Sequence, residues 1–282
     1  MRPIDVMHLG KQHVICCWEV DGWLIDPGPQ SCEATLLAAI DHQQPKGLLL
    51  THIHFDHAGA AGALVRRWPD LPVYVHERGA PHLASPEKLV ASAARLYGGL
   101  EGLNQLWGEV VPVPEDNLRI LEGGEKGLEG AFTVEYTPGH ASHHVCYLHE
   151  PSRTAIVGDM AGVRVPSDPF TLAPTPPPDI DVEKWDASLE TIAAWEPTAL
   201  GLTHFGLVED PPEQLERVRE SLHAQAEFAA EHDEAGFVEA YGARVREHAQ
   251  GGDAILQAAP PDQLYLGLRR YLTKAGRVPS DR

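Results

Sequence analysis

The sequence has few cysteines and no long apolar run. Its 282 residues include 4 cysteines, none of them in a Cys-x-x-Cys pair, and the adjacent Cys16 and Cys17 would point to opposite faces of a strand. This pattern excludes a disulfide framework and favours a reducing compartment. No apolar run approaches the roughly 18 residues of a membrane span, and the first ten residues lack the apolar centre of a signal peptide. We therefore expect a cytoplasmic protein that is not inserted in a membrane.

Basic residues are the minority among the charged side chains. There are 22 Lys and Arg against 41 Asp and Glu, which gives a formal net charge of −19. Long-range repulsion of this kind disfavours polyanions, so we expect neither a nucleic acid nor an anionic membrane surface as a partner. The partner class that remains is a small-molecule substrate.

Strand and helix patterns alternate along the first part of the chain. Residues 14–25, VICCWEVDGWLI, predict two strands joined by a tight turn at Asp21 and Gly22. Residues 31–41 have helical apolar spacing, and a helix is expected from Asp181. Further short strands are expected at 46–51, 71–79, 132–137, 144–148, 154–159 and 198–204.

Two parts of the chain are mainly helical in pattern. Residues 83–110 predict a helical insertion between two strands, and the chain from Pro211 onward carries successive apolar stripes at helical spacing. The last stripe runs from Leu264 to Leu272. Any apolar side chains of this stripe that stay exposed on the folded chain would form a contact in a homodimer, whereas buried ones would belong to the core.

The segment THIHFDH, residues 51–57, follows the apolar run GLLL and holds four potential metal ligands. In an extended segment, residues two apart project to the same side, so His52 and His54 can hold one ion. Asp56 and His57 begin the next helix and would face a neighbouring position, where the helix dipole favours a carboxylate. One loop can therefore serve two metal ions.

Three further candidate ligands follow short apolar strands. TPGH ends at His140, VGD ends at Asp159 and GLTH ends at His204. Side chains at one edge of a sheet converge in space even when they are far apart in the sequence, which is how α/β sites are usually built. We therefore expect these three side chains to meet the THIHFDH segment.

Taken in order, THIHFDH, TPGHASHH, VGD and LTHFG closely resemble the motifs of the metallo-β-lactamase-fold hydrolases, with WLIDPG in its expected place upstream. The resemblance covers about residues 12–208. It implies an α/β (α+β) fold, namely a four-layer αββα sandwich with a dinuclear site at one edge of its two sheets. Residues 1–210 would then form the catalytic domain, with the helical insertion at 83–110, and residues 211–282 a helical C-terminal extension packed on it.

The resemblance also implies a set of seven ligands. These are His52, His54 and His140 for the first ion, Asp56, His57 and His204 for the second, and Asp159 as a bridge between the two. The ions would be divalent, with zinc expected first and iron or manganese as alternatives. They would lower the pKa of a bridging water molecule toward about 7 and so supply hydroxide as the nucleophile. Asp56 would handle the proton during catalysis.

The chain departs from the usual pattern at GHASHH, where relatives often have glycine before the second histidine. His143 stands at that position, and His144 matches the second histidine of the family. Because seven ligands already satisfy two ions, we expect His144 to support a ligand without binding metal, and His143 to lie at the rim of the site.

The metal motif does not select a substrate, because the family cleaves several kinds of bond and includes redox enzymes. TPGHASHHVCYLHE resembles part of glyoxalase II, but the Lys and aromatic residues that hold glutathione after the bridging Asp are missing, and only Arg164 offers a cation there. A small, largely apolar ester, thioester or lactone fits best. We expect four residues to line the pocket: Tyr97 and Trp107 of the insertion, Arg164, and Phe170 of the Pro-rich loop (residues 166–178). Core packing explains any one of the aromatic residues equally well.

Three other functions stay open from the sequence. A mononuclear-iron, persulfide dioxygenase-like enzyme would use fewer of the seven ligands, and a phosphodiesterase or nuclease of this fold would be expected to carry a basic surface. A non-catalytic metal-binding module would prefer a closed, Cys-rich site. The complete ligand set and the net charge of −19 favour the dinuclear hydrolase.

Overall fold

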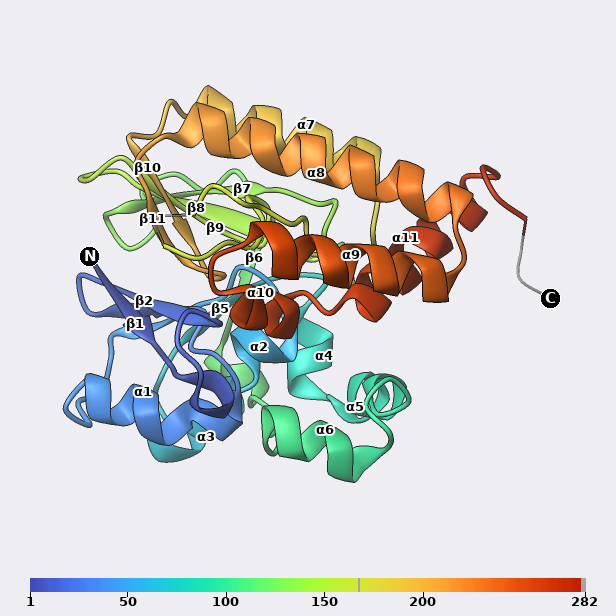
Figure 1. The fold of residues 1–282 in the computed structure, drawn as a ribbon. Helices are drawn as coiled ribbons and strands as arrows, with labels where there is room; N and C mark the ends of the chain where they lie inside the picture. The colour runs from blue at the N-terminus through green and yellow to red at the C-terminus, as the bar shows by residue number, and fades with distance from the viewer. Residues whose placement is uncertain (167, 280–282) are drawn as a thin grey trace.

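Two mixed β-sheets lie face to face between layers of helices (Figure 1). The computed structural model describes residues 1–166 and 168–279. The first sheet consists, in spatial order, of β1 (Arg2–Asp5), β2 (Cys16–Val20), β3 (Trp23–Ile25), β4 (Gly47–Leu49), β5 (Val73–His76) and β6 (Leu118–Leu121). The second consists of β11 (Gly206–Val208), β10 (Ala199–Leu202), β9 (Thr154–Gly158), β8 (Val145–His149) and β7 (Phe132–Tyr136).

Each sheet combines a hairpin region with parallel strands. β1, β2 and β3 are antiparallel, and the β2–β3 turn is formed by Asp21 and Gly22 with positive φ angles of 51° and 87°, as the Asp-Gly pair predicts. β3 to β6 then run parallel. In the second sheet β9 and β10 are parallel, whereas β7, β8 and β11 pair antiparallel with their neighbours. β4 and β9 therefore deliver their carboxyl ends, and the residues that follow, toward the site.

Helices cover the outer face of both sheets. Figure 1 shows α1 (Glu33–Ala39) and α3 (Ala61–Arg67) outside the first sheet, and α7 (Val182–Ala194) and α8 (Pro211–Glu231) outside the second. Asp181 caps α7 by accepting a hydrogen bond from the Lys184 amide. The four layers confirm the αββα sandwich predicted from the sequence.

The two sheets share an aromatic core. Trp18 of the first sheet is 1% exposed, and its indole Nε1 donates to the Leu202 carbonyl oxygen of the second sheet at 3.2 Å. Tyr147 of the second sheet is fully buried and donates its hydroxyl to the Leu50 carbonyl oxygen at 2.8 Å. Each ring thus buries a large apolar surface while its single polar atom finds a partner across the interface. These contacts fix the two sheets relative to each other, and the site lies between them.

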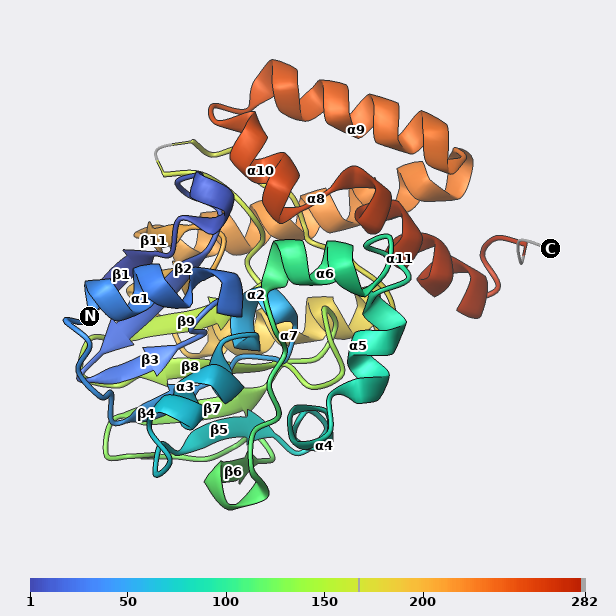
Figure 2. The same ribbon diagram turned by 90° about the horizontal axis from the view of Figure 1, so that it is seen from below.

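Two helical regions stand at one end of the sandwich. The insertion consists of α4 (Ala80–Ala84), α5 (Glu87–Ala93) and α6 (Leu100–Trp107), and the C-terminal region continues after α8 with α9 (Glu234–His248), α10 (Gly252–Ala258) and α11 (Pro261–Lys274). Figure 2 shows α5 and α6 facing α10 and α11 around the short α2 (Phe55–Ala58). Leu264, Leu268 and Leu272 of the last stripe are all buried within the chain, so these three side chains belong to the core.

Among the helices of residues 1–166 and 168–279, none has the length and apolarity needed to cross a bilayer.

Candidate metal centre

The THIHFDH segment leaves β4 and enters α2, as the sequence predicts. His54 precedes the helix in an extended conformation, and Asp56 lies in its first turn. His52 and His57 are fully buried, whereas His54 and Asp56 remain partly accessible. The segment therefore presents two imidazoles inside the protein, and one imidazole and one carboxylate toward the accessible side.

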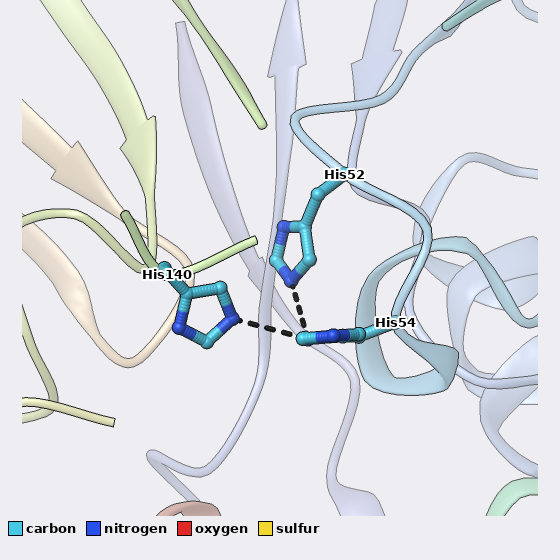
Figure 3. Close-up of side chains that lie close together, drawn as sticks. All are labelled: His52, His54 and His140. Atoms are coloured by element: carbon cyan, nitrogen blue, oxygen red, sulfur yellow. Dashed lines mark hydrogen bonds between the residues drawn. The ribbon is translucent and has the colours of Figure 1, made fainter. Parts of the chain in front are cut away.

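Three imidazoles form the first cluster of potential ligands (Figure 3). His52 Nε2 and His140 Nε2 each lie 3.0 Å from His54 Nδ1. Two nitrogens bound at 2.0–2.1 Å to a tetrahedral zinc ion are about 3.3 Å apart, so the spacing of these nitrogens suits one ion. Figure 3 shows the rings of His52 and His140 pointing at His54 from two different segments of the chain.

A second cluster lies beside the first, and one carboxylate faces both. His204 Nε2 lies 3.3 Å and His57 Nε2 3.8 Å from Asp56 Oδ2. Asp159 places Oδ1 3.1 Å from His57 Nε2 and 3.5 Å from His204 Nε2, and it places Oδ2 3.1 Å from His140 Nε2. The two oxygens of Asp159 are therefore oriented to serve two ions at once.

Hydrogen bonds on the far side of four rings determine which nitrogen carries the proton. His140 Nδ1 donates to the Pro174 carbonyl oxygen at 2.8 Å, and His204 Nδ1 donates to the Val14 carbonyl oxygen at 2.5 Å. The Thr51 hydroxyl donates its proton to a carboxylate. Its oxygen must therefore accept the hydrogen bond that it shares with His52 Nδ1. His57 Nδ1 also faces a carboxylate. In all four rings Nδ1 is consequently a donor, which leaves Nε2, directed at the clusters, as the nitrogen that a metal ion can bind.

Asp26 is the carboxylate that accepts two of these hydrogen bonds, and the sequence analysis assigned no role to it. It is fully buried, and its Oδ2 accepts from His57 Nδ1 at 2.8 Å, Thr51 Oγ1 at 2.7 Å and Thr203 Oγ1 at 2.9 Å. Its Oδ1 accepts from the Thr51 amide at 2.8 Å. The available signal was an acid at the end of a strand in WLIDPG, the same placement that identified Asp159. Asp26 thus orients His57 and joins three segments of the chain.

Asp26→Asn is expected to weaken binding of the second ion by about 10- to 100-fold, the usual effect of losing such an outer carboxylate. The measurement is a competition titration of the protein against a chromophoric chelator. Asp21→Asn is the matched control, because Asp21 and Asp26 both have φ of 51°, a conformation that asparagine tolerates. Equal affinities for both variants and the unaltered protein would show that Asp26 does not support the ligand.

Several ligand atoms are buried without a hydrogen bond, and this tests whether metal ions fit. His57 Nε2, His204 Nε2 and Asp159 Oδ1 have no hydrogen-bond partner within the part of the chain that the structure describes. Leaving a buried polar atom unsatisfied costs about 1–3 kcal/mol, and more for a charged group. Two imidazole nitrogens and a carboxylate oxygen directed at one another are a donor set that a divalent cation between them would satisfy. The residues therefore fit a pair of divalent ions.

The protonation of the two clusters favours cations as well. Burial and the neighbouring imidazole of His140 lower the pKa of His54 to about 4, so this ring is neutral near pH 7 and free to bind metal. Burial opposes the ionisation of Asp159, but the imidazoles of His57, His140 and His204 outweigh it and hold the pKa of the carboxyl well below its usual range. Burial likewise lowers the pKa of His57, but the carboxylates of Asp159, Asp56 and Asp26 together raise it well above normal. The carboxylates thus favour a positive charge between the clusters, and a bound metal ion would provide that charge.

His144 lies behind the first cluster. Its ring is 5.0 Å from that of His52, and its Nδ1 donates to Thr137 Oγ1 at 3.0 Å. It belongs to none of the three groups of potential ligands found among the described residues. This position agrees with a supporting role for His144.

The two clusters open into a cavity of about 680 Å³. His54, Asp56 and Asp159 lie at its inner end, and the insertion contributes Tyr97 and Trp107 to its wall, as the sequence predicts. A cavity of this volume is in the range that holds a small organic ligand. The metal centre is therefore accessible to a substrate of moderate size.

Arg164 and Phe170 do not line this cavity. Arg164 Nη1 donates instead to the Gln214 side-chain oxygen at 2.8 Å, and Phe170 packs against the hydrophobic core. The backbone beside Arg164 is held by a bridge between Val163 and Leu172, which exchange two hydrogen bonds, and neither Arg164 nor Phe170 reaches the site. The prediction for these two residues was wrong, and the part of the Pro-rich loop that reaches the cavity is 174–178.

The C-terminal helices supply a wall that the sequence did not predict. Gln257, Pro260 and Leu264 line the cavity. The Gln257 side-chain nitrogen lies 3.0 Å from His8 Nδ1, and the His8 ring stacks on Trp107 of the insertion at 4.9 Å. Three distant segments thus meet at one wall, and no local sequence signal marks such a meeting.

Three known proteins resemble this chain in sequence. ST1585 of Sulfurisphaera tokodaii, a metallo-beta-lactamase fold-containing protein, is 27% identical over 73% of this chain and 76% of its own length. The probable metallo-hydrolase YqgX of Bacillus subtilis is 32% identical, over 49% of this chain and 59% of its own length. The hydroxyacylglutathione hydrolase of Salmonella typhi is 30% identical, over 45% of this chain and 38% of its own length. The chain thus spans less than two thirds of the last two relatives.

Two solved structures resemble the fold. The crystal structure of ST1585 gives a TM-score of 0.70 at 23% identity and covers 95% of this chain and 97% of its own. The crystal structure of TTHA1623 in a di-iron-bound form gives a TM-score of 0.56 at 25% identity and covers 77% of this chain and 96% of its own. Residues 21–204, which carry all the candidate ligands, match the sequence profile of the metallo-beta-lactamase superfamily. The chain belongs to the metallo-beta-lactamase superfamily.

Proposed function

We propose that the chain is a dinuclear metal-dependent hydrolase of a small, largely apolar ester, thioester or lactone. The observation that carries the proposal is the position of Asp159, whose two oxygens face separate clusters of imidazoles at the inner end of an accessible cavity. The di-iron form of TTHA1623 supports a pair of ions on this fold. Zinc is the first candidate for this chain because its ligands are mostly imidazoles, and iron and manganese are the alternatives.

The chemistry would be shared between the ions and the protein. Two divalent ions, when bound, would supply Lewis acidity that lowers the pKa of a water molecule and polarises the substrate's carbonyl group. Asp56 lines the cavity and stays ionised: burial alone would raise the pKa of its carboxyl, but His57 and His204 lower it. This carboxylate would accept the proton of the attacking water and direct it to the leaving group.

The cavity wall favours an apolar acyl group. Leu89 and Leu96 of the insertion side, Pro176 of the Pro-rich loop and Leu264 of α11 line the cavity together with Trp107. These side chains come from three separate segments and form an apolar part of the wall. An acyl chain lying along this wall would place its carbonyl group at the clusters.

A glutathione thioester is less well supported. The relative that hydrolyses hydroxyacylglutathione matches 45% of this chain. The cation that follows the bridging carboxylate here is Arg164, and its guanidinium is turned toward Gln214 and away from the cavity. The position that would hold glutathione therefore lacks its charged contact, which favours a substrate without that tripeptide.

The proposal is tested by assaying metal-loaded protein against a panel of p-nitrophenyl esters, acyl thioesters, γ-lactones and bis(p-nitrophenyl) phosphate. Turnover of a carboxylic acid derivative, absent from a His54→Ala blank, is the expected result. Turnover of the phosphodiester alone would favour the phosphodiesterase alternative. One iron per chain with uptake of oxygen in the presence of a persulfide would favour the dioxygenase.

Chain length should matter among the esters. We expect kcat/KM for p-nitrophenyl hexanoate to exceed that for the acetate by about 200-fold, because each of four extra methylenes contributes about 0.8 kcal/mol when transferred from water to an apolar wall. Initial rates at substrate concentrations below KM measure this ratio directly. Equal values for the two esters would mean that the apolar wall does not bind the acyl group.

A further inference from the structure

His143 is a buried imidazole that the proposed metal centre does not use. It is 8% exposed and it lines the cavity. The sequence predicts a residue at the rim, but a rim residue would be solvated. A histidine enclosed this far is expected to have hydrogen-bond partners.

The loop around His143 is held rigidly. The preceding Ser142 donates from its amide and its hydroxyl to Asp179 Oδ2, at 3.3 Å and 2.5 Å, and its carbonyl oxygen accepts from the Tyr136 hydroxyl at 2.9 Å. The following His144 is held by Thr137. The backbone therefore fixes the place of the His143 ring even though the ring itself takes no part in these bonds.

The His143 ring makes no hydrogen bond with any residue in 1–166 or 168–279. Its Nδ1 is sealed from solvent without a partner. The nitrogen that can reach the cavity is consequently Nε2. The ring centroid lies 5.7 Å from that of His54 and 6.1 Å from that of His52, so His143 flanks the first cluster on its cavity side.

The position of the single proton on this ring follows from these surroundings. A buried imidazolium would need a partner for each N–H group, and Nδ1 of this ring has none among the described residues, so the ring carries a single N–H group. An N–H at the sealed Nδ1 would have no acceptor, which costs about 1–3 kcal/mol. The proton is therefore expected on Nε2, where water or a ligand in the cavity can accept it.

We propose that His143 donates a hydrogen bond from Nε2 to the substrate's carbonyl oxygen, beside the first cluster, and so stabilises the negative charge that develops there. This inference rests on the proposed hydrolysis of an acyl substrate. No proton leaves the ring in this step, because a neutral imidazole acts only as a fixed donor. Fixed donors are effective because they need no reorganisation as charge develops. His143 would then be a catalytic residue in addition to the metal ligands.

The test compares His143→Phe, which keeps the ring volume without a donor, with His143→Gln, whose amide can donate from a similar position. We expect His143→Phe to lower kcat for p-nitrophenyl hexanoate about 100-fold with little change in KM, and His143→Gln to recover activity to within about 10-fold of the unaltered enzyme. Both variants should keep two ions per chain. His223→Phe on the outer helix α8 is the control. Unchanged kcat in His143→Phe, or loss of metal from it, would overturn the proposal.

A second measurement does not depend on turnover. Long-range ¹H–¹⁵N spectra of the zinc-loaded protein, with His143→Phe used for assignment, should show His143 protonated on Nε2, and added hexanoate should shift that nitrogen. Protonation on Nδ1, or no shift with hexanoate, would contradict the inference. If the unaltered protein hydrolyses nothing in the panel, the proposed hydrolase function fails, and these spectra still decide whether His143 is a donor in the cavity.

Discussion

His54→Ala is expected to reduce kcat/KM for the best acyl substrate by about 1,000-fold or more, the scale on which catalytic machinery fails when a central member is removed. His54 Nδ1 lies 3.0 Å from His52 Nε2 and from His140 Nε2. Its removal takes one of three imidazoles from the first ion and leaves two imidazoles with the shared Asp159, so the first site should bind zinc much more weakly than the intact set. Only the second site should then be filled.

Elemental analysis and thermal unfolding accompany this assay. The metal content of His54→Ala is expected to fall from two ions per chain to about one, while far-ultraviolet circular dichroism stays that of the folded protein. His223→Ala, on the outer surface, is the matched control and should behave like the unaltered enzyme. Full activity in His54→Ala with one ion per chain would rule out a role for the first cluster in the reaction.

Asp56→Asn is expected to lower kcat by about 100- to 10,000-fold, the usual contribution of a general acid or base. The asparagine side chain keeps the size of the carboxylate and can still offer an oxygen to the second ion, but it cannot accept a proton. His57 and His204 remain within reach of that ion. Occupancy of the second site should consequently be restored by excess metal, whereas turnover should not.

The assay for Asp56→Asn is kcat at saturating zinc, with metal bound per chain measured on the same sample. Glu129→Gln serves as a control for the removal of an acid far from the cavity. Retention of both full metal content and full turnover in Asp56→Asn would show that another group handles the proton.

Much of the fold and of the ligand set follows from local sequence signals. Asp21 and Gly22 form the turn that this pair favours, and Asp181 caps α7 as its position predicts. Candidate ligands placed after short apolar strands meet in space because neighbouring strands deliver their ends to one edge of the sandwich. The structure brings together all seven ligands expected from the family resemblance.

What the sequence could not predict depends on long-range contacts. Asp26 receives hydrogen bonds from segments 25 and 177 residues away, and no local pattern encodes such partners. β1, β6 and β11 are three or four residues long and stand at or next to sheet edges, so they lack the alternation that marks a longer strand. Arg164 was misplaced because it adjoins the Val163–Leu172 bridge and its guanidinium donates to Gln214, 50 residues away in the sequence.

The cavity wall illustrates the same limit. His8, Trp107 and Gln257 come from the beginning, the middle and the end of the chain, and they meet through one stacked pair and one side-chain contact. Apolar side chains in the C-terminal helices predicted packing, but they gave no indication of which residues would face the substrate. The residues that line the pocket could therefore be identified only from the tertiary structure, whereas the candidate metal ligands could be identified from the sequence.

The most direct test of the account is an anomalous difference map from crystals of the zinc-loaded protein, recorded at the zinc absorption edge. The account predicts two peaks, one on each side of the Asp159 carboxylate, the first beside His52, His54 and His140 and the second beside Asp56, His57 and His204. A single peak, or two peaks that do not share Asp159, would contradict the dinuclear centre on which the proposed hydrolysis depends.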